Sequence, residues 1–183
     1  MTSAIDPGAI LDFWFSDHAR AHWFQSTPAF DQEVEERFLG DYQRVRAGEA
    51  DALAETADGC LVLILFCDQF PRNMFRGTAR AFESDAKALE LAEGALERGY
   101  PEGADADRQM FFYLPFMHSE DAAHQSRCVA LFSNRPEHEN SLDFARQHAA
   151  IINRFGRFPH RNAALGRDTS QEEAAFLQDH AGF

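Results

Sequence analysis

The sequence predicts an all-α protein, and three observations support that prediction. Apolar residues recur at helical spacing along most of the chain, capping residues and prolines stand where such stretches begin, and no convincing strand is evident. The length of 183 residues suits one domain with a sizeable core. We therefore expect residues 1–183 to form a single domain of seven or eight helices, joined by short turns and packed as antiparallel pairs.

Helix signals are clear near the N-terminus. Asp6 followed by Pro7 predicts a capped helix start, and Pro28 opens a second helix that Gly48 ends. Along this second helix the apolar positions repeat every three or four residues: Phe30, Val34, Phe38, Tyr42 and Val45. Both segments are therefore predicted to be helices with one buried face.

The apolar run CLVLILFC, from Cys60 to Cys67, fits either a buried strand or a buried helix. Leucine outnumbers the β-branched residues in it, and no alternating partner strand appears elsewhere. We therefore expect a central buried helix that ends at Pro71, because proline disrupts a helix interior. The stretch TARAFESDAKALELAEGALERG then predicts an amphipathic helix followed by Gly99, with one apolar stripe of Phe82, Leu89 and Leu96.

Four further helices are expected toward the C-terminus. The first covers Asp105 to Leu114, before Pro115, and the next extends from a Ser119 cap through Phe132. The stretch NSLDFARQHAAIINRFG predicts a third, which Gly156 ends. The last helix is expected after a capping box formed by Thr169 and Glu172.

Charge and composition exclude several classes of function. The formal net charge is −13, from 30 acidic and 17 basic residues, which disfavours binding to nucleic acid or to an anionic membrane. Three cysteines without a CxxC pair suit a reducing compartment, and the N-terminus lacks the basic region of a signal peptide. The longest apolar run spans eight residues and is too short to cross a bilayer. A cytoplasmic protein without nucleic-acid or membrane partners is expected.

Two segments contain arginine but no acidic residue. Residues 69–80 include the sequence FPRN, and residues 153–167 include FPHRN; together they hold seven of the 17 basic residues and none of the 30 acidic ones. In each, proline restricts the backbone and phenylalanine can anchor the turn in the core. The guanidinium fork of arginine suits a carboxylate or a phosphate. We call these segments the first and second arginine turns.

Three interpretations of the arginine turns remain open. In the first, both turns contribute to an anion-binding pocket whose ligand-binding residues are Arg72, Asn73, Arg154, Arg157, Arg161 and Asn162. In the second, the arginines pair with the protein's own acids and hold helix ends together. In the third, they form an interface for an acidic peptide or protein partner.

Histidines and carboxylates near these turns suggest acid–base chemistry. A histidine paired with a carboxylate titrates near neutral pH, and an adjacent arginine could hold a substrate with a carboxylate or phosphate. The candidate catalytic residues are Asp68, His118, Glu120 and His160. Such a set is expected of a small hydrolase, lyase or isomerase. Although Glu120 and His124 would share a helix face, the spacing matches no zinc signature, so neither a metal nor a cofactor is expected.

Several motifs, in order along essentially the whole chain, resemble a bacterial family. They are ILDFWF, LILFCDQFPRNMFRGTARAFESDAKAL, FFYLPFMHSED, QSRCVALF and IINRFGRFPHRNAALGR, and the family is the bacterial domain-of-unknown-function family numbered 924. The resemblance implies an all-helical, tetratricopeptide-like superhelical fold and no assigned activity, cofactor or catalytic residue. Folds of that type often present a concave face to a peptide, so a non-catalytic module that binds an acidic peptide is the alternative to a small-molecule enzyme.

Overall fold

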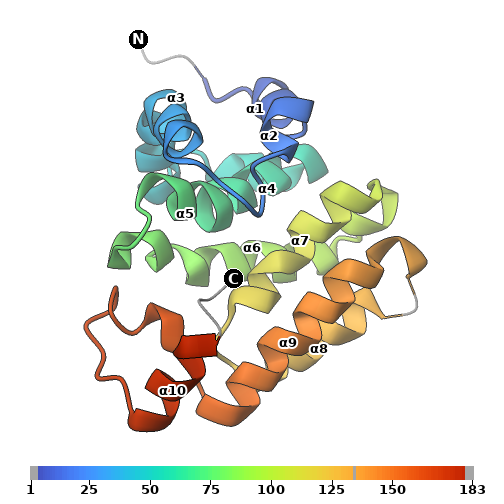
Figure 1. The fold of residues 1–183 in the computed structure, drawn as a ribbon. Coiled ribbons are helices and arrows are strands. Elements are labelled where there is room, and N and C mark those ends of the chain that lie inside the picture. The colour runs from blue at the N-terminus through green and yellow to red at the C-terminus, as the bar shows by residue number, and fades with distance from the viewer. Residues whose placement is uncertain (1–3, 134, 180–183) are drawn as a thin grey trace.

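The computed structural model describes residues 4–133 and 135–179, and the secondary structure in those ranges is entirely helical (Figure 1). This confirms the predicted all-α class. The α-helices are α1 (Pro7–Trp14), α2 (Asp17–Arg20), α3 (Pro28–Arg46), α4 (Ala57–Ile64), α5 (Phe70–Met74), α6 (Asp85–Glu97), α7 (Ala106–His118), α8 (Ala122–Phe132), α9 (Glu139–Phe155) and α10 (Gln171–Asp179). One π-helical turn, η2 (Leu65–Gln69), and five short 3-10 turns complete it: η1 (Asp51–Glu55), η3 (Ala79–Phe82), η4 (Tyr100–Gly103), η5 (Pro136–His138) and η6 (Pro159–Arg161).

The predicted helix starts near the N-terminus are confirmed. The side chain of Asp6 accepts hydrogen bonds from the backbone N–H groups of Gly8 and Ala9, as an N-cap should. Helix α3 begins at Pro28 and buries every residue of the predicted apolar stripe. Gly48, just after α3, has a φ of 80°, a left-handed backbone conformation that glycine adopts without strain.

The central helix is continuous from α4 through η2 to α5, and residues 59–71 are all buried. In Figure 1 it lies between α3 and α6, and it contacts α1, α3, α6 and α7. The prediction that this helix ends at Pro71 is therefore wrong. The π turn explains the difference, because the N–H of Phe70 donates to Leu65 O, five residues back, and the register changes before the proline.

Proline leaves one carbonyl of the central helix without its usual donor, since Pro71 has no N–H to offer Cys67 O. The hydroxyl of Ser84, at the start of α6, donates to that carbonyl at 2.8 Å. Ser84 is the N-cap residue of α6 but makes no side-chain cap bond there. A side chain from another helix therefore satisfies the carbonyl that the proline leaves free.

Aromatic contacts fill the space around the central helix. The Phe70 ring is fully buried and stacks on Phe38 at a centroid distance of 4.8 Å. It also meets Phe66 and Trp14 edge-on, at 4.9 and 5.2 Å. Such edge and stacked pairs add to the stabilisation that burial alone supplies. The phenylalanine of the first arginine turn thus anchors that turn in the main core.

Helix α7 does not end before Pro115, as predicted, but continues to His118. The residues on both sides of the proline, from Gln109 to Met117, are buried. Burial of Phe116 and Met117 beyond the proline offsets the hydrogen bond that Pro115 cannot make. This extension places His118 at the C-terminal end of a fully packed helix.

Two predicted helix caps are wrong by one or two residues. The N-cap of α8 is Asp121, which accepts from the backbone of Ala123 and His124, because a carboxylate two or three residues before these N–H groups reaches them directly. The capping box of α10 is formed reciprocally by Ser170 and Glu173, at 3.1 and 2.8 Å, rather than by Thr169 and Glu172.

The chain after α9 forms a separate C-terminal part. Gly156 ends α9 with a φ of 70°, as predicted. Beyond it Phe158 is fully buried in a small apolar cluster with Ile151, Ile152, Phe155 and Phe176 that is distinct from the main core. Within the described ranges, no helix is both long and apolar enough to span a membrane.

Replacing Ser84 with alanine is expected to destabilise the fold by about 1–3 kcal/mol, the cost of a buried carbonyl left without a donor. The carbonyl concerned is Cys67 O, which Pro71 cannot satisfy. The free energy of unfolding would be measured by urea titration. Ser126→Ala is the matched control, since the exposed Ser126 hydroxyl donates to a carbonyl of its own helix. Equal losses in the two variants would contradict this account of the central helix.

Candidate functional site

A buried carboxylate lies at the centre of the candidate site. Asp68 is on the π turn of the central helix and is 1% exposed. Its Oδ1 lies 2.7 Å from Nδ1 of His118, and Gln69 donates to its Oδ2 at 2.6 Å. A guanidinium nitrogen of Arg72 lies 3.4 Å from Oδ1, and the same side chain donates to Asp68 O. Single π turns of this kind are frequent at functional sites.

Electrostatics keeps this pair in a defined protonation state. Burial by itself raises the pKa of Asp68, but attraction to His118 in its protonated form, the charge of Arg72 and the hydrogen bonds from His118 and Gln69 outweigh it and hold that pKa below its ordinary value. Burial lowers the pKa of His118, and the Arg72 charge acts in the same direction against the attraction of Asp68. The pair is therefore an ionised carboxylate that accepts from Nδ1–H of a neutral imidazole.

The second nitrogen of His118 is available for chemistry. Nε2 makes no hydrogen bond to any residue in the described ranges, and the side chain is 17% exposed. Because Nδ1–H donates to Asp68, the lone pair of the neutral ring lies on Nε2. The arrangement can therefore accept a proton at Nε2 from a molecule that reaches it.

The two arginine turns meet at Asp85, the first residue of α6. Arg72, from the first turn, binds both carboxylate oxygens of Asp85 in a parallel pair of bonds at 2.9 and 3.0 Å. Arg161, from the second turn, donates to Oδ2 of Asp85 at 3.3 Å and to His118 O at 2.9 Å. The second turn therefore contacts both α6 and the end of α7, beside the Asp68–His118 pair.

Arg161 is buried although it carries a charge. It is 6% exposed, and its guanidinium lies 4.6 Å from the ring centroids of Phe82 and of Phe158. Burial and the nearby Arg72 lower its pKa to about 10, so it stays protonated at neutral pH. Its Nε is buried and has no hydrogen-bond partner among residues 4–133 and 135–179.

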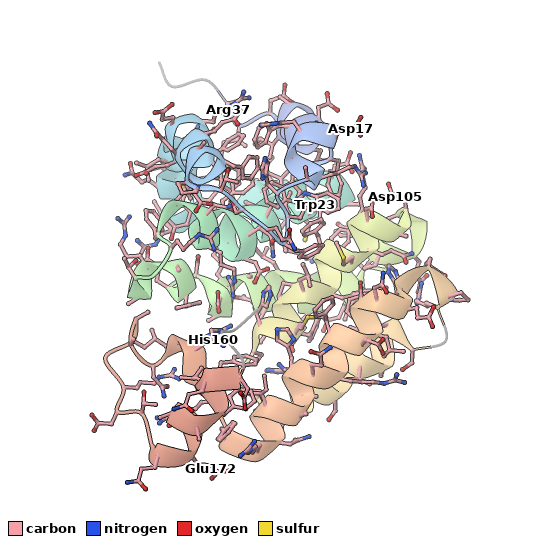
Figure 2. The ribbon with its side chains drawn as sticks, viewed as in Figure 1. Asp17, Trp23, Arg37, Asp105, His160 and Glu172 are labelled. Carbon is pink, nitrogen blue, oxygen red and sulfur yellow. The ribbon has the colours of Figure 1, made fainter. Side chains whose placement is uncertain are left out.

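Two further histidines flank the cluster, which consists of Asp68, Gln69, Arg72, Phe82, Asp85, His118 and Arg161. The ring of His148 lies 6.4 Å from that of His118, and its Nδ1 is 2.8 Å from Phe144 O. Burial lowers the pKa of His148 to about 3. Burial and the charge of Arg161 lower the pKa of His160 to about 4, and this side chain makes no hydrogen bond within the part of the chain described. In Figure 2, His160 lies on the side of the C-terminal part that faces α6.

Glu120 does not pair with a histidine. It precedes α8, so the expectation that it shares a helix face with His124 is wrong: Asp121 takes the cap position, and Glu120 lies in a bend before it. Both oxygens of Glu120 bind Arg167, at 2.9 and 2.8 Å, and Oε1 also accepts from the backbone N–H of Phe158 at 2.9 Å. Glu120 thus connects the C-terminal part to the end of α7.

Four of the predicted ligand-binding residues lie outside the cluster. Asn73 donates to Ser26 and Asp31, and Asn162 donates to Thr169. The other two bind acids of α10, namely Glu172 for Arg154 and Glu173 for Arg157, the latter through two bonds at 2.7 and 2.9 Å. Every arginine of the two turns has a carboxylate within 4.0 Å: Arg72, Arg76, Arg80, Arg154, Arg157, Arg161 and Arg167.

Three residues of the cluster are missing from the sequence-based prediction. Asp85 bridges the two turns, Gln69 holds the Asp68 carboxylate, and Phe82 covers the Arg161 guanidinium. For Asp85 the sequence does contain a signal that could have identified it: it is among the first acidic residues after the acid-free first arginine turn. Nothing local distinguishes Gln69 or Phe82 from ordinary helix residues.

Concave surfaces elsewhere do not include this cluster. One hollow of about 460 Å³ lies over η1 and α6 and is lined mainly by charged residues, among them Asp51, Lys87, Glu90, Glu93, Glu97 and Arg98. A second, of about 150 Å³, lies at the start of α4 beside Tyr100 and Arg108. The described residues contain no group of three or more histidine, cysteine, aspartate or glutamate side chains placed to hold a metal ion.

Comparison with known proteins finds a family and a solved structure. The family described as "Bacterial protein of unknown function (DUF924)" matches residues 10–181. A solved protein of unknown function, ATU0120 from Agrobacterium tumefaciens, is 40% identical in sequence, with a TM-score of 0.89 over 95% of this chain and 97% of that one. No curated protein matches.

The histidines in and beside the cluster predict a loss of stability on mild acidification. Folding lowers the pKa of His160 to about 4, below the ordinary 6.5, so the unfolded chain binds more protons between these values. The contribution of neutral His160 to the free energy of unfolding is complete above about pH 6.5 and is lost as the pH falls toward 4. The free energy of unfolding, measured by urea titration from pH 7 to 4, should fall less steeply for His160→Gln than for the wild type.

The control is Gln147→Ala, at an exposed residue of α9 that carries no titratable group. It should lose stability with pH as the wild type does. If His160→Gln and the wild type had the same slope, the electrostatic account of the cluster would be wrong.

Proposed function

The chain belongs to this family of bacterial proteins of unknown function, and for this member we propose that the Asp68–His118 pair transfers a proton to or from a small anionic molecule bound beside Arg72 and Arg161. One observation carries the proposal. A buried, ionised carboxylate orients a neutral imidazole whose other nitrogen has no partner in the described ranges and whose side chain is partly exposed. This is the arrangement of a general base.

The chemistry follows from the tautomer of His118. With Nδ1–H bonded to Asp68, Nε2 can remove a proton from water or from a carbon next to a carboxyl group, and the resulting imidazolium is stabilised by the Asp68 carboxylate. Arg72 and Arg161 lie on the same side of the cluster and can bind a carboxylate or phosphate. A small-molecule hydrolase, lyase or isomerase is the reaction class that these groups support.

The energetic cost of the cluster also favours a functional role. A buried ion pair contributes little net stability, and apolar residues of similar volume often serve the fold as well or better. The cluster buries the charges of Asp68 and Arg161 almost completely. It also occupies a π turn, where the helix departs from its regular hydrogen bonding. A purely structural contact would need neither feature.

The alternative of an acidic-peptide module has weaker support. The arginines that an external acidic partner could reach most easily, Arg76, Arg80 and Arg154, are each about half exposed and lie beside Asp31, Glu83 and Glu172. A peptide would have to compete with these carboxylates. The tetratricopeptide-like superhelical arrangement, the cytoplasmic location and the absence of nucleic-acid and membrane partners stay predictions.

The test begins with thermal unfolding against a panel of phosphate, phosphorylated sugars, nucleotides, mono- and dicarboxylates, acidic peptides and divalent metals. A ligand at about 100 times its dissociation constant stabilises the folded state by roughly 2.7 kcal/mol. Any compound that binds is then incubated in D₂O and followed by NMR for deuterium incorporation or product. We expect His118→Gln, whose amide can still donate to Asp68, to bind the compound but to lose proton transfer.

His124→Gln is the control, because His124 lies outside the cluster and bonds Ser119. It should retain both binding and proton transfer. Proton transfer that survives in His118→Gln would remove His118 from the mechanism. A panel in which no compound stabilises the wild type would favour the interpretation that the arginines only hold helix ends together.

A further inference from the structure

We propose that the anionic group recognised at Arg72 and Arg161 is a carboxylate of a small molecule, and that the side chain of Asp85 occupies its binding position until the ligand displaces it. The inference rests on the anion site proposed above and names its ligand class. Three observations support it: the geometry at Arg72, the charge balance of the cluster and the position of Asp85 in α6.

The binding position has the geometry of a planar carboxylate. Arg72 meets the two oxygens of Asp85 with two nearly equal bonds, of 2.9 and 3.0 Å, and Arg161 adds a third donor at 3.3 Å to one of them. Parallel bonds of this kind form between the flat guanidinium fork and the flat carboxylate. A ligand carboxylate can therefore replace that of Asp85 without any change in the two arginine side chains.

The charges of the cluster favour a single negative charge. Arg72 and Arg161 are balanced by Asp68 and Asp85, and Arg167 is balanced by Glu120. Burial holds the neighbouring His118, His148 and His160 in their neutral forms at pH 7. A monocarboxylate that replaces the Asp85 carboxylate leaves this balance unchanged. A phosphate dianion would add a further negative charge to a partly buried site whose described cations, Arg72, Arg161 and Arg167, are already balanced.

Arg161 retains a donor that Asp85 leaves unused. Its Nη1 binds Asp85 and its Nη2 binds His118 O, whereas Nε is buried without a partner among the residues described. An unpaired buried donor of a charged group is costly, so an acceptor supplied there would stabilise the folded state. A ligand that replaces Asp85 at Nη1 does not reach this donor, because Nε–H shares an edge of the guanidinium with Nη2, as in the Arg157–Glu173 pair. The Nε–H signal of Arg161 therefore reports a change in the surroundings of the guanidinium when a ligand binds at Nη1.

Asp85 can leave without unfolding its helix. It is the first residue of α6, and its side chain is 21% exposed. A carboxylate in the first turn remains favourable after rotating toward solvent, because the free N–H groups and the helix dipole attract negative charge. Asp85 therefore competes with an external carboxylate, and the protein's affinity for its ligand is set partly by that competition.

The experiment compares Asp85→Asn with the wild type, using acetate, lactate, pyruvate and inorganic phosphate at matched ionic strength. Thermal unfolding and titration of the arginine Nε–H signals in proton–nitrogen NMR spectra report binding. The amide removes the competing charge but keeps the shape of the side chain. We expect acetate, lactate and pyruvate to bind about tenfold or more tightly to the variant, because one charge-assisted pair no longer competes. Asp58→Asn is the control, at an exposed carboxylate paired with Arg108.

The outcomes separate this inference from the proposed anion site. Phosphate that binds both proteins more tightly than the carboxylates would overturn the carboxylate assignment and leave the anion site intact. No binding of any anion to either protein would overturn both. If Asp85→Asn does not fold, the wild-type NMR spectrum is used instead. The Nε–H signal of Arg161 is assigned as the one that Arg161→Lys removes, and lactate should shift it. A signal that phosphate shifts but lactate does not would contradict the proposal.

Discussion

The carboxylate of Asp68 is buried within the central helix, and the positions of several other elements follow from the need to stabilise its charge. A buried charge is tolerated only when partners and hydrogen bonds replace water. Asp68 obtains them from Gln69 and Arg72 on its own helix and from His118 at the end of α7. Arg72 in turn binds Asp85 at the start of α6, and Asp85 binds Arg161 of the second arginine turn. One series of opposite charges therefore connects the central helix, α6, α7 and the C-terminal part.

Around Asp68, side chains form hydrogen bonds with backbone carbonyls of the central helix. Pro71 leaves Cys67 O of the central helix without its usual donor, and the side chain of Ser84 supplies a replacement. The side chain of Arg72 also donates to Asp68 O, on the π turn. Ser84 and Asp85 are neighbours at the start of α6. The same end of that helix thus satisfies the irregular backbone and neutralises the arginine, which keeps the geometry around Asp68 rigid. A rigid surrounding is what a proton-transfer pair requires.

The structure also clarifies why an internal ion-pair network and a ligand site need not be exclusive. Most arginines of the two turns have one carboxylate partner each and connect helix ends, as Arg157 does with Glu173. At the meeting point of the turns the match is incomplete, because Arg72 and Arg161 share Asp85 while Arg161 Nε has no partner in the described ranges. The cluster is therefore well satisfied for folding but has one unused donor. The Asp85 carboxylate, which the two arginines share, is the partner that we propose an external carboxylate replaces.

Local sequence patterns were sufficient to predict the helical class and most helix positions. The stripe from Phe30 to Val45, the Asp6 cap and the Gly156 stop depend on residues three or four positions apart, so local spacing encodes them. The same local rules placed helix ends wrongly at Pro71 and near Pro115, because burial on both sides of each proline offsets its missing hydrogen bond. The sequence also indicated the two arginine turns and the residue types of an acid–base pair.

Which charged side chains form pairs could be learned only from the packing of the helices. From the sequence, Asp68 and Glu120 are equal candidates to pair with a histidine. In the structure Asp68 pairs with His118, fifty residues away, and Glu120 binds Arg167. It likewise brings Asp85 between two turns that lie far apart in the chain. Helix formation depends on near neighbours, whereas the partner of a charge depends on how complete helices pack. For this reason the elements could be predicted from the sequence and the site could not.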